Sequence, residues 1–596
     1  MPELGWEAWV TLAVILTTVL TLVRDWVSPS VAVFGATVVL MVVGITTAEE
    51  AFSGFSNPAP ITVAALFVVA RAVEKTGALQ PLIRAVLGNG QGRPNPRRRR
   101  LARLLVPTAA SSALLNNTPV VAMLAPQVAD WAEKRGQSAS RYLMPLSFAT
   151  ILGGTLTLVG TSTNLVVAGL MQESGLEPMR MFELTRIGLP VVVIGLALVV
   201  ILAPILLPER RPPRRAFEED VREYVIQQRV APGGPLDGTT VAGAGLRHLE
   251  GLFLAESERD GEVIAPVAPA TALRGGDRLA FVGRVDIVRD LQRIPGLLAE
   301  EQKHVEPFRG GEHTFFEVVV SPASTLVGQT LREADVRSRF QAAVLAIHRA
   351  GERVNAKLGE VPLREGDTLL VLSDRGFGPR WRDRSEFLLV SHLGGSPTPP
   401  VRQAYFVGAV TLAVVLVAGI GGVPILHTAL LGAIVLVLGK ALSPGEARDS
   451  LELDTLVLIA SSFGLGAAMD ASGLADAIGH LIVAIFAGWG AIGVLLGVTV
   501  ATVLLTELIT NNAAAVLLFP IALAAAAEIG ADPRPFLIGL TVAASASFLT
   551  PIGYQTNTMV YGMGGYRFGD YARLGAPLTL VVLLTILIFV PIFWAF

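Results

Sequence analysis

Long apolar runs with almost no charge recur along this chain and restrict its fold more than any other feature. Four of them approach the roughly 20 residues that an α-helix needs to cross a bilayer, namely Trp9–Val23, Val31–Ile45, Ile187–Leu207 and Leu578–Phe596. Only 16% of the 596 residues are charged, whereas soluble domains carry about 25%. The pattern predicts an α-helical protein that crosses the lipid bilayer many times.

Hydropathy divides the chain into two apolar halves and a polar insert. Residues 1–207 and 401–596 form the apolar halves, and Pro- and Arg-rich segments flank the insert between them. Within the insert, a Leu-Arg-x-Gly-Asp-x-Leu motif occurs twice, 90 residues apart, and each copy runs into a β-like segment. We therefore expect two tandem α+β domains, at 208–305 and 306–400.

The two apolar halves repeat each other. Asn116-Asn117 and Asn511-Asn512 interrupt apolar runs 395 residues apart, and Gly160–Asn164 and Gly553–Asn557 form a second pair of polar motifs 393 residues apart. A primary amide in hydrocarbon is costly unless it is paired. Amides at the same relative place in both halves predict one site built from two repeats, as in many membrane transporters.

Lysine and arginine placement predicts the membrane topology. The basic segments Arg93–Arg100, Glu133–Arg135 and Arg210–Arg215 are expected in the cytoplasm. Residues 104–131 then form a re-entrant helical hairpin, and residues 491–529 form a second one that enters from the opposite face. Both termini are expected outside and the insert inside. The predicted location is the cell inner (cytoplasmic) membrane.

The polar motifs suit an anion and a small cation. Helix N-termini at the hairpin turns would offer free N–H groups and positive dipole ends, and the four motifs contain no Lys or Arg. Glu507 lies one helical turn before Asn511. An ionisable group in a hairpin arm is a candidate cation ligand or proton carrier, although it could instead face a wet vestibule.

Several function classes find no support in the sequence. The absence of cysteine excludes disulfides, thiolate metal sites and cysteine nucleophiles, and the seven histidines show no metal-ligand spacing. Gly243–Gly251 has the wrong spacing for a dinucleotide loop, and the chain has no P-loop or nucleophile elbow. We expect neither an enzyme nor a cofactor, nucleic-acid partner or transition-metal site.

These motifs resemble those of the divalent-anion/sodium symporter family, and the resemblance covers both membrane halves. The family carries Ser-Asn-Thr at its hairpin tips and Thr-Pro-Pro-Asn in its loops. This chain departs from that pattern, with Asn116 and Asn511 in place of the serines, Ala513 in place of the second threonine, and Ser162-Thr163 and Gln555-Thr556 in place of the proline pairs. The insert resembles two tandem TrkA-C (RCK C-terminal) domains, as in the sulfate-permease branch.

The resemblance implies an inverted-repeat, homodimeric elevator transporter. It implies one cation site at Ser112, Asn116, Asn117 and Gly160, and a second at Glu507, Thr510, Asn512 and Gly553. It implies substrate binding by Asn117, Thr118, Ser162, Thr163, Asn164, Asn512, Gln555, Thr556 and Asn557.

The prediction is a secondary transporter of a small divalent oxyanion, sulfate, coupled to sodium or protons. A small ligand bound to the TrkA-C domains would regulate it. Di- or tricarboxylate symport, cation/proton or arsenite-type exchange, and an anion sensor remain as alternatives. The altered tips and loops favour a smaller, tetrahedral anion.

Overall fold

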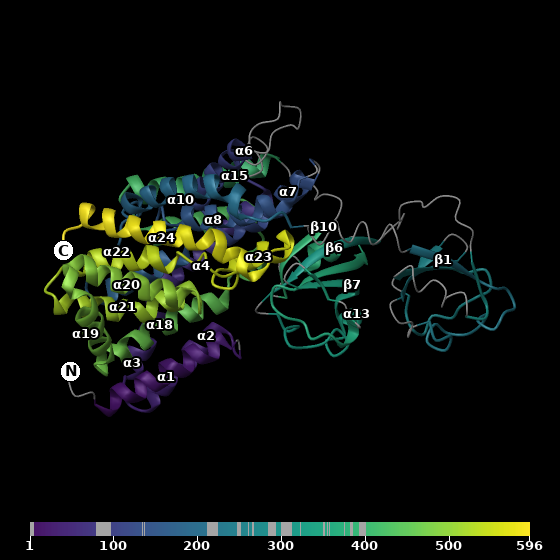
Figure 1. Ribbon diagram of the computed structural model, residues 1–596, viewed down its shortest axis with the longest axis horizontal. Coiled ribbons are helices and arrows are strands. Elements are labelled where there is room, and N and C mark those ends of the chain that lie inside the picture. Colours follow the sequence, from purple (N-terminus) through teal and green to yellow (C-terminus); the bar gives the residue numbers. More distant parts are fainter. Residues whose placement is uncertain are drawn as a thin grey trace. The chain divides into compact units, whose positions relative to one another are not determined.

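The computed structural model describes residues 5–596 except 25, 79–96, 134, 136, 211–224, 247–251, 260–261, 265–266, 284–293, 300–312, 322–323, 350–351, 355, 357, 375, 382–385 and 393–400. The chain forms two compact units (Figure 1). The helical unit comprises Met1–Glu209, Pro397–Val560 and Arg567–Phe596, and the insert unit comprises Arg210–Ser396 and Tyr561–Tyr566.

The helices of the first half are α1 (Trp6–Val23), α2 (Pro29–Val42), α3 (Ala48–Phe52), η1 (Ser53–Phe55), α4 (Pro58–Thr76), α6 (Arg97–Ser112), α7 (Asn117–Glu133), η2 (Ala139–Arg141), α8 (Leu143–Gly154), α9 (Ser162–Glu173) and α10 (Thr185–Leu206). Those of the second half are α15 (Val401–Ile420), α16 (Ile425–Leu438), α17 (Pro444–Asp449), α18 (Leu453–Ala471), α19 (Leu474–Phe486), η5 (Ala487–Trp489), α20 (Gly490–Thr506), α21 (Asn511–Glu528), α22 (Pro533–Ala544), α23 (Gln555–Gly564) and α24 (Phe568–Phe593). Within the described residues, eight helical segments are long and apolar enough to span a membrane. The multi-pass prediction is therefore confirmed.

The repeat extends to details of helix capping. Thr47 accepts the backbone N–H of Glu50, whose carboxylate accepts the N–H of Thr47, and this capping box starts α3. Ser443 and Glu446 form the same box at the start of α17, 396 residues later. Reciprocal bonds of this kind satisfy two backbone donors that a helix start leaves unpaired. The two halves thus share local structure at this position as well.

The helices pack in two groups. In one, α2 packs on α18, α4 on α15 and α16, and α1 on α2. In the other, α6 and α10 pack on α8, α10 packs on α24, and α20 and α21 pack on α22. Helices α9 and α21 contact both groups, because α9 packs on α4 and α21 packs on α18 and α19. The hairpins and the broken helix pairs belong to the second group.

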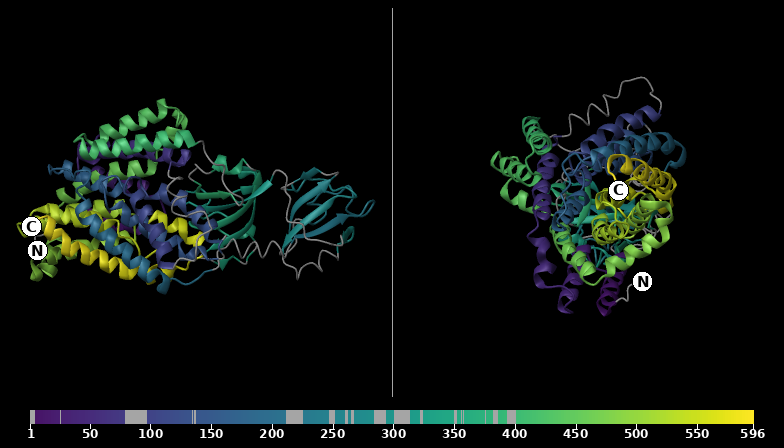
Figure 2. Two further views of the ribbon diagram at one scale, coloured as in Figure 1. Left: turned by 90° about the horizontal axis from the view of Figure 1, so that it is seen from above. Right: turned by 90° about the vertical axis from the view of Figure 1, so that its left-hand side faces the viewer.

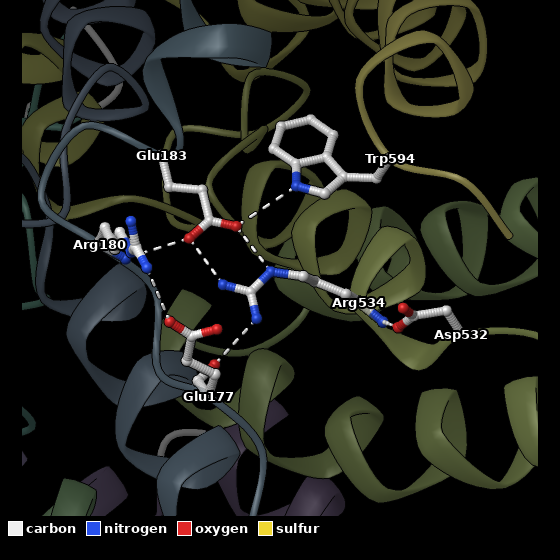
Figure 3. A network of polar contacts seen from close by, with 6 residues as sticks. All are labelled: Glu177, Arg180, Glu183, Asp532, Arg534 and Trp594. Carbon is white, nitrogen blue, oxygen red and sulfur yellow. Dashed lines mark hydrogen bonds and ion pairs between the residues drawn. The ribbon is translucent and has the colours of Figure 1, made fainter.

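A half-buried arginine, Arg534, joins three segments at one end of the helical unit (Figure 3). Arg534 donates from Nε and Nη2 to the two carboxylate oxygens of Glu183, each at 2.7 Å, and from Nη1 to the carbonyl of Glu177 at 3.0 Å. The indole of Trp594 donates to the same carboxylate at 3.3 Å. Burial favours a higher pKa for Glu183, but bonds from Arg534 and the Arg180 backbone outweigh burial and hold that pKa below its ordinary value.

These contacts agree with the predicted grouping of loops. The predicted topology puts the loop after α9, the start of α22 and the end of α24 outside, and Figures 1 and 2 show the start of α1 and the end of α24 at the same end of the helical unit. Loops assigned to the other side also meet one another. Lys75 pairs with Glu446 at 2.7 Å, and Ser30 donates to Asp454 at 2.7 Å.

The insert unit contains two five-stranded antiparallel sheets. The first is built from β1 (Val225–Val230), β2 (Leu252–Arg259), β3 (Glu262–Ile264), β4 (Arg278–Gly283) and β5 (Leu297–Ala299), in the order β3-β2-β4-β1-β5. The second is built from β6 (His313–Val320), β7 (Ala342–Arg349), β8 (Glu352–Arg353), β9 (Thr368–Asp374) and β10 (Phe387–His392), with α13 (Val336–Phe340), η4 (Leu358–Glu360) and α14 (Phe377–Trp381) beside them in sequence. Its order, β8-β7-β9-β6-β10, matches the first strand for strand.

The 90-residue repeat of the insert is visible at the level of single ion pairs. Arg259 binds Asp277 through two bonds of 2.7 and 2.6 Å, and Arg349 binds Asp367 through two bonds of 2.8 and 2.7 Å. Both aspartates are buried, so each pair compensates the cost of a buried charge. The two α+β domains expected from the sequence thus have the same internal framework.

One position breaks this repeat. Glu256 follows a bulge in β2, whereas Ala346 follows the equivalent bulge in β7. The Oε1 atom of Glu256 is buried and has no hydrogen-bond partner among the described residues. Burial, with a contribution from nearby Glu258, raises the pKa of Glu256 to about 7.

Candidate functional site

Two helical hairpins carry the paired asparagines. Helix α6 ends at Ser112 and α7 starts at Asn117, while α20 ends at Thr506 and α21 starts at Asn511. The Ser112 hydroxyl donates to the amide oxygen of Asn117. At the other tip, Thr510 is the N-cap of α21 and accepts a backbone N–H from the first turn. Each tip therefore presents the start of a helix, where backbone N–H groups lack helical partners.

In each broken helix pair, an asparagine side chain bonds to backbone carbonyls within the break. The chain is non-helical between α8 and α9, and Asn164 Nδ2 donates to the carbonyls of Gly154 at 3.0 Å and Thr157 at 2.8 Å. Asn557 Nδ2 makes the two equivalent bonds in the break between α22 and α23, at 3.0 and 3.4 Å. These bonds satisfy carbonyls that the helix ends leave unpaired. The donor groups of both amides are thus engaged within their own breaks.

Glycine is required at the first break for a steric reason. A Cβ on Gly160 would lie 2.8 Å from the Cα of Gly154, closer than real Cβ atoms approach backbone. The glycine lets the loop return against the end of α8.

The second tip reaches the first break. The amide oxygen of Asn512 accepts from Thr163 at 2.8 Å and from Ser162 at 3.3 Å. The amide nitrogen of Asn511 donates to the Thr163 hydroxyl at 2.7 Å. Ser162 is the first residue of α9 and Asn511 the first residue of α21, so two helix N-termini meet here.

The first tip reaches the second break in the same way. Asn117 Nδ2 donates to the Tyr554 hydroxyl, which also lies 3.1 Å from the Thr161 hydroxyl. Thr118 donates to the amide oxygen of Gln555 at 3.0 Å. Because α7 starts at Asn117 and α23 starts at Gln555, a second pair of helix N-termini meets beside the first. The four helix starts form one polar cluster that draws on both repeats.

Glu507 lies at the base of the second tip and is only 6% exposed. Its Oε1 accepts the backbone N–H of Leu549 at 2.8 Å, and its Oε2 accepts that of Thr550 at 3.0 Å. The carboxylate is therefore held against the start of the second break, beside Gly553.

Other predicted site residues lie away from the tip-to-break contacts. The Thr556 hydroxyl and the Asn557 Oδ1 accept from Ser147, at 2.9 and 2.7 Å, below the second break. Asn116 and Phe67 both line a cavity of about 20 Å³ between the first tip, the first break and α4. A cavity of that size holds roughly one water molecule.

Sequence reasoning missed Tyr554 and Thr161, whose hydroxyls lie between the two tips. Tyr554 lies inside the motif Gly553–Asn557, where the amides and the aliphatic hydroxyl are the more prominent ligand candidates. Its alignment with Thr161, 393 residues earlier, was the available signal. Asn511, which binds Thr163, was also left out of the predicted binding set.

The electrostatics of the cluster come from neutral groups and helix ends. The hydrogen bonds recorded for the tip residues in the described part of the chain involve amides, hydroxyls and backbone, and none involves Lys or Arg. The described residues contain no group of three or more His, Cys, Asp or Glu that could hold a metal ion. Such a cluster can bind an anion through donors and dipoles without a fixed cation.

Comparison with known proteins places this sequence in a transporter family. The sequence matches the citrate transporter (CitMHS) family over residues 12–534 and 490–596. An uncharacterized transporter from Synechocystis sp. is 36% identical, with 96% of this chain and 95% of that protein covered. A sulfur deprivation response regulator of Chlamydomonas reinhardtii is 34% identical, with 94% and 98% covered. Sodium/sulfate cotransporter 1 of the same alga is 25% identical, with 97% and 89% covered.

The matched family and its transporter relatives cover almost the whole chain and are not enzymes. The predicted relationship to sodium-coupled anion transporters is confirmed at this level, whereas these matches do not test the TrkA-C assignment. This chain belongs to the citrate transporter family.

Proposed function

We propose that the protein is a sodium-coupled transporter of a small divalent oxyanion, sulfate. The observation that carries the proposal is the meeting of four helix N-termini, those of α7, α9, α21 and α23, in one cluster. Each helix start contributes free N–H groups and the positive end of a dipole. Sulfate accepts hydrogen bonds at all four oxygens, so a cluster of donors without fixed cations suits its reversible binding.

Binding would replace contacts that each tip makes with the opposite break. Asn512, Ser162 and Thr163 are bonded together. An entering anion would take over donors such as the Thr163 hydroxyl, the Asn117 amide and the Thr118 hydroxyl. The cavity beside Asn116 holds about one water, so the cluster must open to admit the anion.

Glu507 supplies a reason for cation coupling. A buried carboxylate close to an anion site opposes anion binding unless a cation compensates it. Sodium beside Glu507, Thr510, Asn512 and Gly553 would therefore raise anion affinity, and the anion would raise sodium affinity by the same factor. A second cation would lie beside Ser112, Asn116, Asn117 and Gly160. The sodium/sulfate cotransporter among the relatives is consistent with this coupling.

The transport cycle would be of the elevator type in a homodimer within the inner membrane. The packing of the helices in two groups supports a division into a fixed and a moving part. The two sheet domains, which we assign as cytoplasmic TrkA-C-like domains, would bind a small ligand that changes the transport rate. Removal of residues 216–395 is expected to alter rate or regulation while leaving substrate preference intact.

The experiment is labelled sulfate uptake by the purified full-length protein in proteoliposomes with an inward sodium gradient. Uptake should be saturable and sodium-dependent. Asn512→Ala and Asn117→Ala should each weaken transport about 10-fold or more, because a lost bond to a charged ligand costs roughly 1.5–3 kcal/mol. Thr428→Val is the control, since the Thr428 hydroxyl on α16 bonds only locally to the Ile425 carbonyl. Asparagine variants that transport like the wild type would refute the site.

A di- or tricarboxylate is the second candidate, because the matched family is described as one of citrate transporters. Tyr554 argues against it. Its side chain occupies the space between the first tip and Thr161 and leaves less room for a carbon backbone. Competition by unlabelled succinate and citrate against labelled sulfate separates the two candidates, since a carboxylate transporter would be inhibited more strongly by these anions than by sulfate.

A further inference from the structure

Three oxygen atoms converge on the backbone of Gly553. A Cβ at this position would overlap the Ser547 hydroxyl and would lie 3.1 Å from both Glu507 Oε2 and the Thr506 carbonyl oxygen. Ser547 is fully buried, and its hydroxyl has no hydrogen-bond partner among the residues that the structure describes. An orphaned buried hydroxyl is costly, so its retention beside a carboxylate and a carbonyl requires an explanation.

The first half of the molecule does not repeat this arrangement. Gly154 stands where the second half has Ser547, 393 residues on, and Ser112 stands where it has Glu507, 395 residues on. The Ser112 hydroxyl is bonded to Asn117. The second half therefore has a carboxylate and a free hydroxyl that the first half lacks.

The oxygens that remain available suit a hard cation. A carboxylate has about four lone-pair positions, and the N–H groups of Leu549 and Thr550 each use one on Glu507. The Ser547 hydroxyl and the Thr506 carbonyl add neutral oxygens on the same side of Gly553 as the Glu507 carboxylate. Carboxylate, hydroxyl and carbonyl oxygens are the ligands that hard cations prefer.

We propose that Glu507, Ser547 and the Thr506 carbonyl form a sodium site that binds sodium without the anion, and more tightly than the first-half site. The proposal rests on the proposed function and deepens it, since it makes the two cation sites chemically unequal. Ser547 becomes a determinant of sodium affinity that the symmetric motifs do not reveal. Sodium would also remove the cost of the unpaired buried hydroxyl.

The test is the thermal stability of the full-length protein in detergent, titrated with sodium chloride against choline chloride at constant ionic strength and without sulfate. Wild type should show saturable stabilisation by sodium. Ser547→Ala and Ser547→Gly, the latter restoring the first-half residue, should raise the apparent sodium Kd about tenfold, which corresponds to ~1.4 kcal/mol. Glu507→Gln should raise it further. Ser461→Ala, which removes another buried unpartnered hydroxyl on α18, should behave like wild type.

Three outcomes would overturn the proposal. They are an unchanged sodium Kd in both Ser547 variants, equal stabilisation of wild type by potassium and sodium, and no sodium-specific stabilisation at all. Sulfate uptake is measured separately, so the two claims can fail independently. If the protein transports sulfate but the Ser547 variants keep the wild-type sodium Kd, only the proposed cation site is refuted. If the protein binds sodium but does not take up sulfate, only the proposed transport function is refuted.

Discussion

At the scale of single residues, Tyr554 distinguishes the two halves of the cluster most clearly. It occupies the position that Thr161 holds in the first repeat, and its hydroxyl contacts Asn117 and Thr161. Tyr554→Thr would make the two breaks alike and remove a ring from the space between the tips. We expect sulfate uptake to fall and inhibition by succinate to rise, because the enlarged site loses a donor and gains room.

Uptake of labelled sulfate with and without succinate measures this change. Tyr554→Phe is the matched control, because it keeps the ring and removes only the hydroxyl. It should reduce sulfate transport without admitting succinate. Identical succinate inhibition in Tyr554→Thr and wild type would show that the ring does not set substrate size.

The sequence predicted part of this residue-level picture. Asn117, Asn512 and Glu507 stood out because polar groups in apolar runs are costly and therefore informative. Tyr554 and Ser547 did not stand out, since a tyrosine or serine in an apolar segment is common and its role depends on what lies opposite. The contacts of Asn512 with Ser162 and Thr163 join residues about 350 positions apart, which repeat spacing alone cannot specify.

At the scale of elements, the clamp formed by Arg534 holds α22, α24 and the loop after α9 together (Figure 3). Arg534→Gln would leave Glu183 buried with fewer donors. We expect a loss of about 2–3 kcal/mol in stability, the size typical of hydrogen bonds to charged groups. Thermal unfolding in detergent measures it.

Arg180→Gln serves as the control for this clamp. The Arg180 side chain is 82% exposed and pairs with Glu177 on the same loop, so its loss should change stability by less than about 0.5 kcal/mol. Equal destabilisation by both substitutions would mean that the half-buried Arg534–Glu183 pair is not what joins the elements.

In the insert, Glu256 on strand β2 should make the stability of the first domain depend on pH. Because burial raises the pKa of Glu256 to about 7, the folded domain binds this proton more tightly than the unfolded chain does. The stabilisation is present below the ordinary value of 4.5 and is lost as the pH rises through about 7. Hydrogen-exchange protection of β2 and β4, corrected for intrinsic rates, should therefore be lower at pH 8 than at pH 5.

The second sheet domain provides an internal control, since Ala346 stands at the equivalent position and cannot titrate. Glu256→Gln should remove the pH dependence of the first domain. If protection of β2 and β4 still falls between pH 5 and pH 8 in this variant, another titrating group causes the effect.

The breaks in α8–α9 and α22–α23 were predictable because Gly160 and Gly553 interrupt apolar runs beside hydroxyls and amides. The role of Asn164 was not predictable from the sequence. It was predicted to bind substrate, but its Nδ2 donates to two carbonyls of its own break. Helix-end carbonyls need donors wherever a helix stops in an apolar setting, and a motif does not reveal which amide meets that need.

At the scale of the whole molecule, hydropathy and charge placement predicted the two membrane halves, their inverted relation and the grouping of loops. The contacts of Glu183 with Arg534, and of Lys75 with Glu446, agree with that grouping. The order of strands in the sheets was not predictable, because it depends on long-range pairing. The 90-residue repeat nevertheless predicted that the two domains would be alike.

The chain has no cysteine, so topology can be tested with single substitutions. Glu177→Cys, in the loop after α9, should react with a membrane-impermeant maleimide in intact cells. Arg448→Cys, whose exposed position on α17 is assigned to the cytoplasm, should react only after permeabilisation. The reverse pattern would invert the predicted topology, and labelling of both in intact cells would contradict it.

The most direct measurement is a cryo-electron microscopy map of the protein with sulfate and sodium. The predicted result is sulfate density bounded by Asn117, Thr118 and Asn512, with a smaller peak beside Glu507 and Ser547. Sulfate density outside the four helix N-termini, or tips that keep their contacts with the opposite breaks at saturating sulfate, would contradict the proposed site.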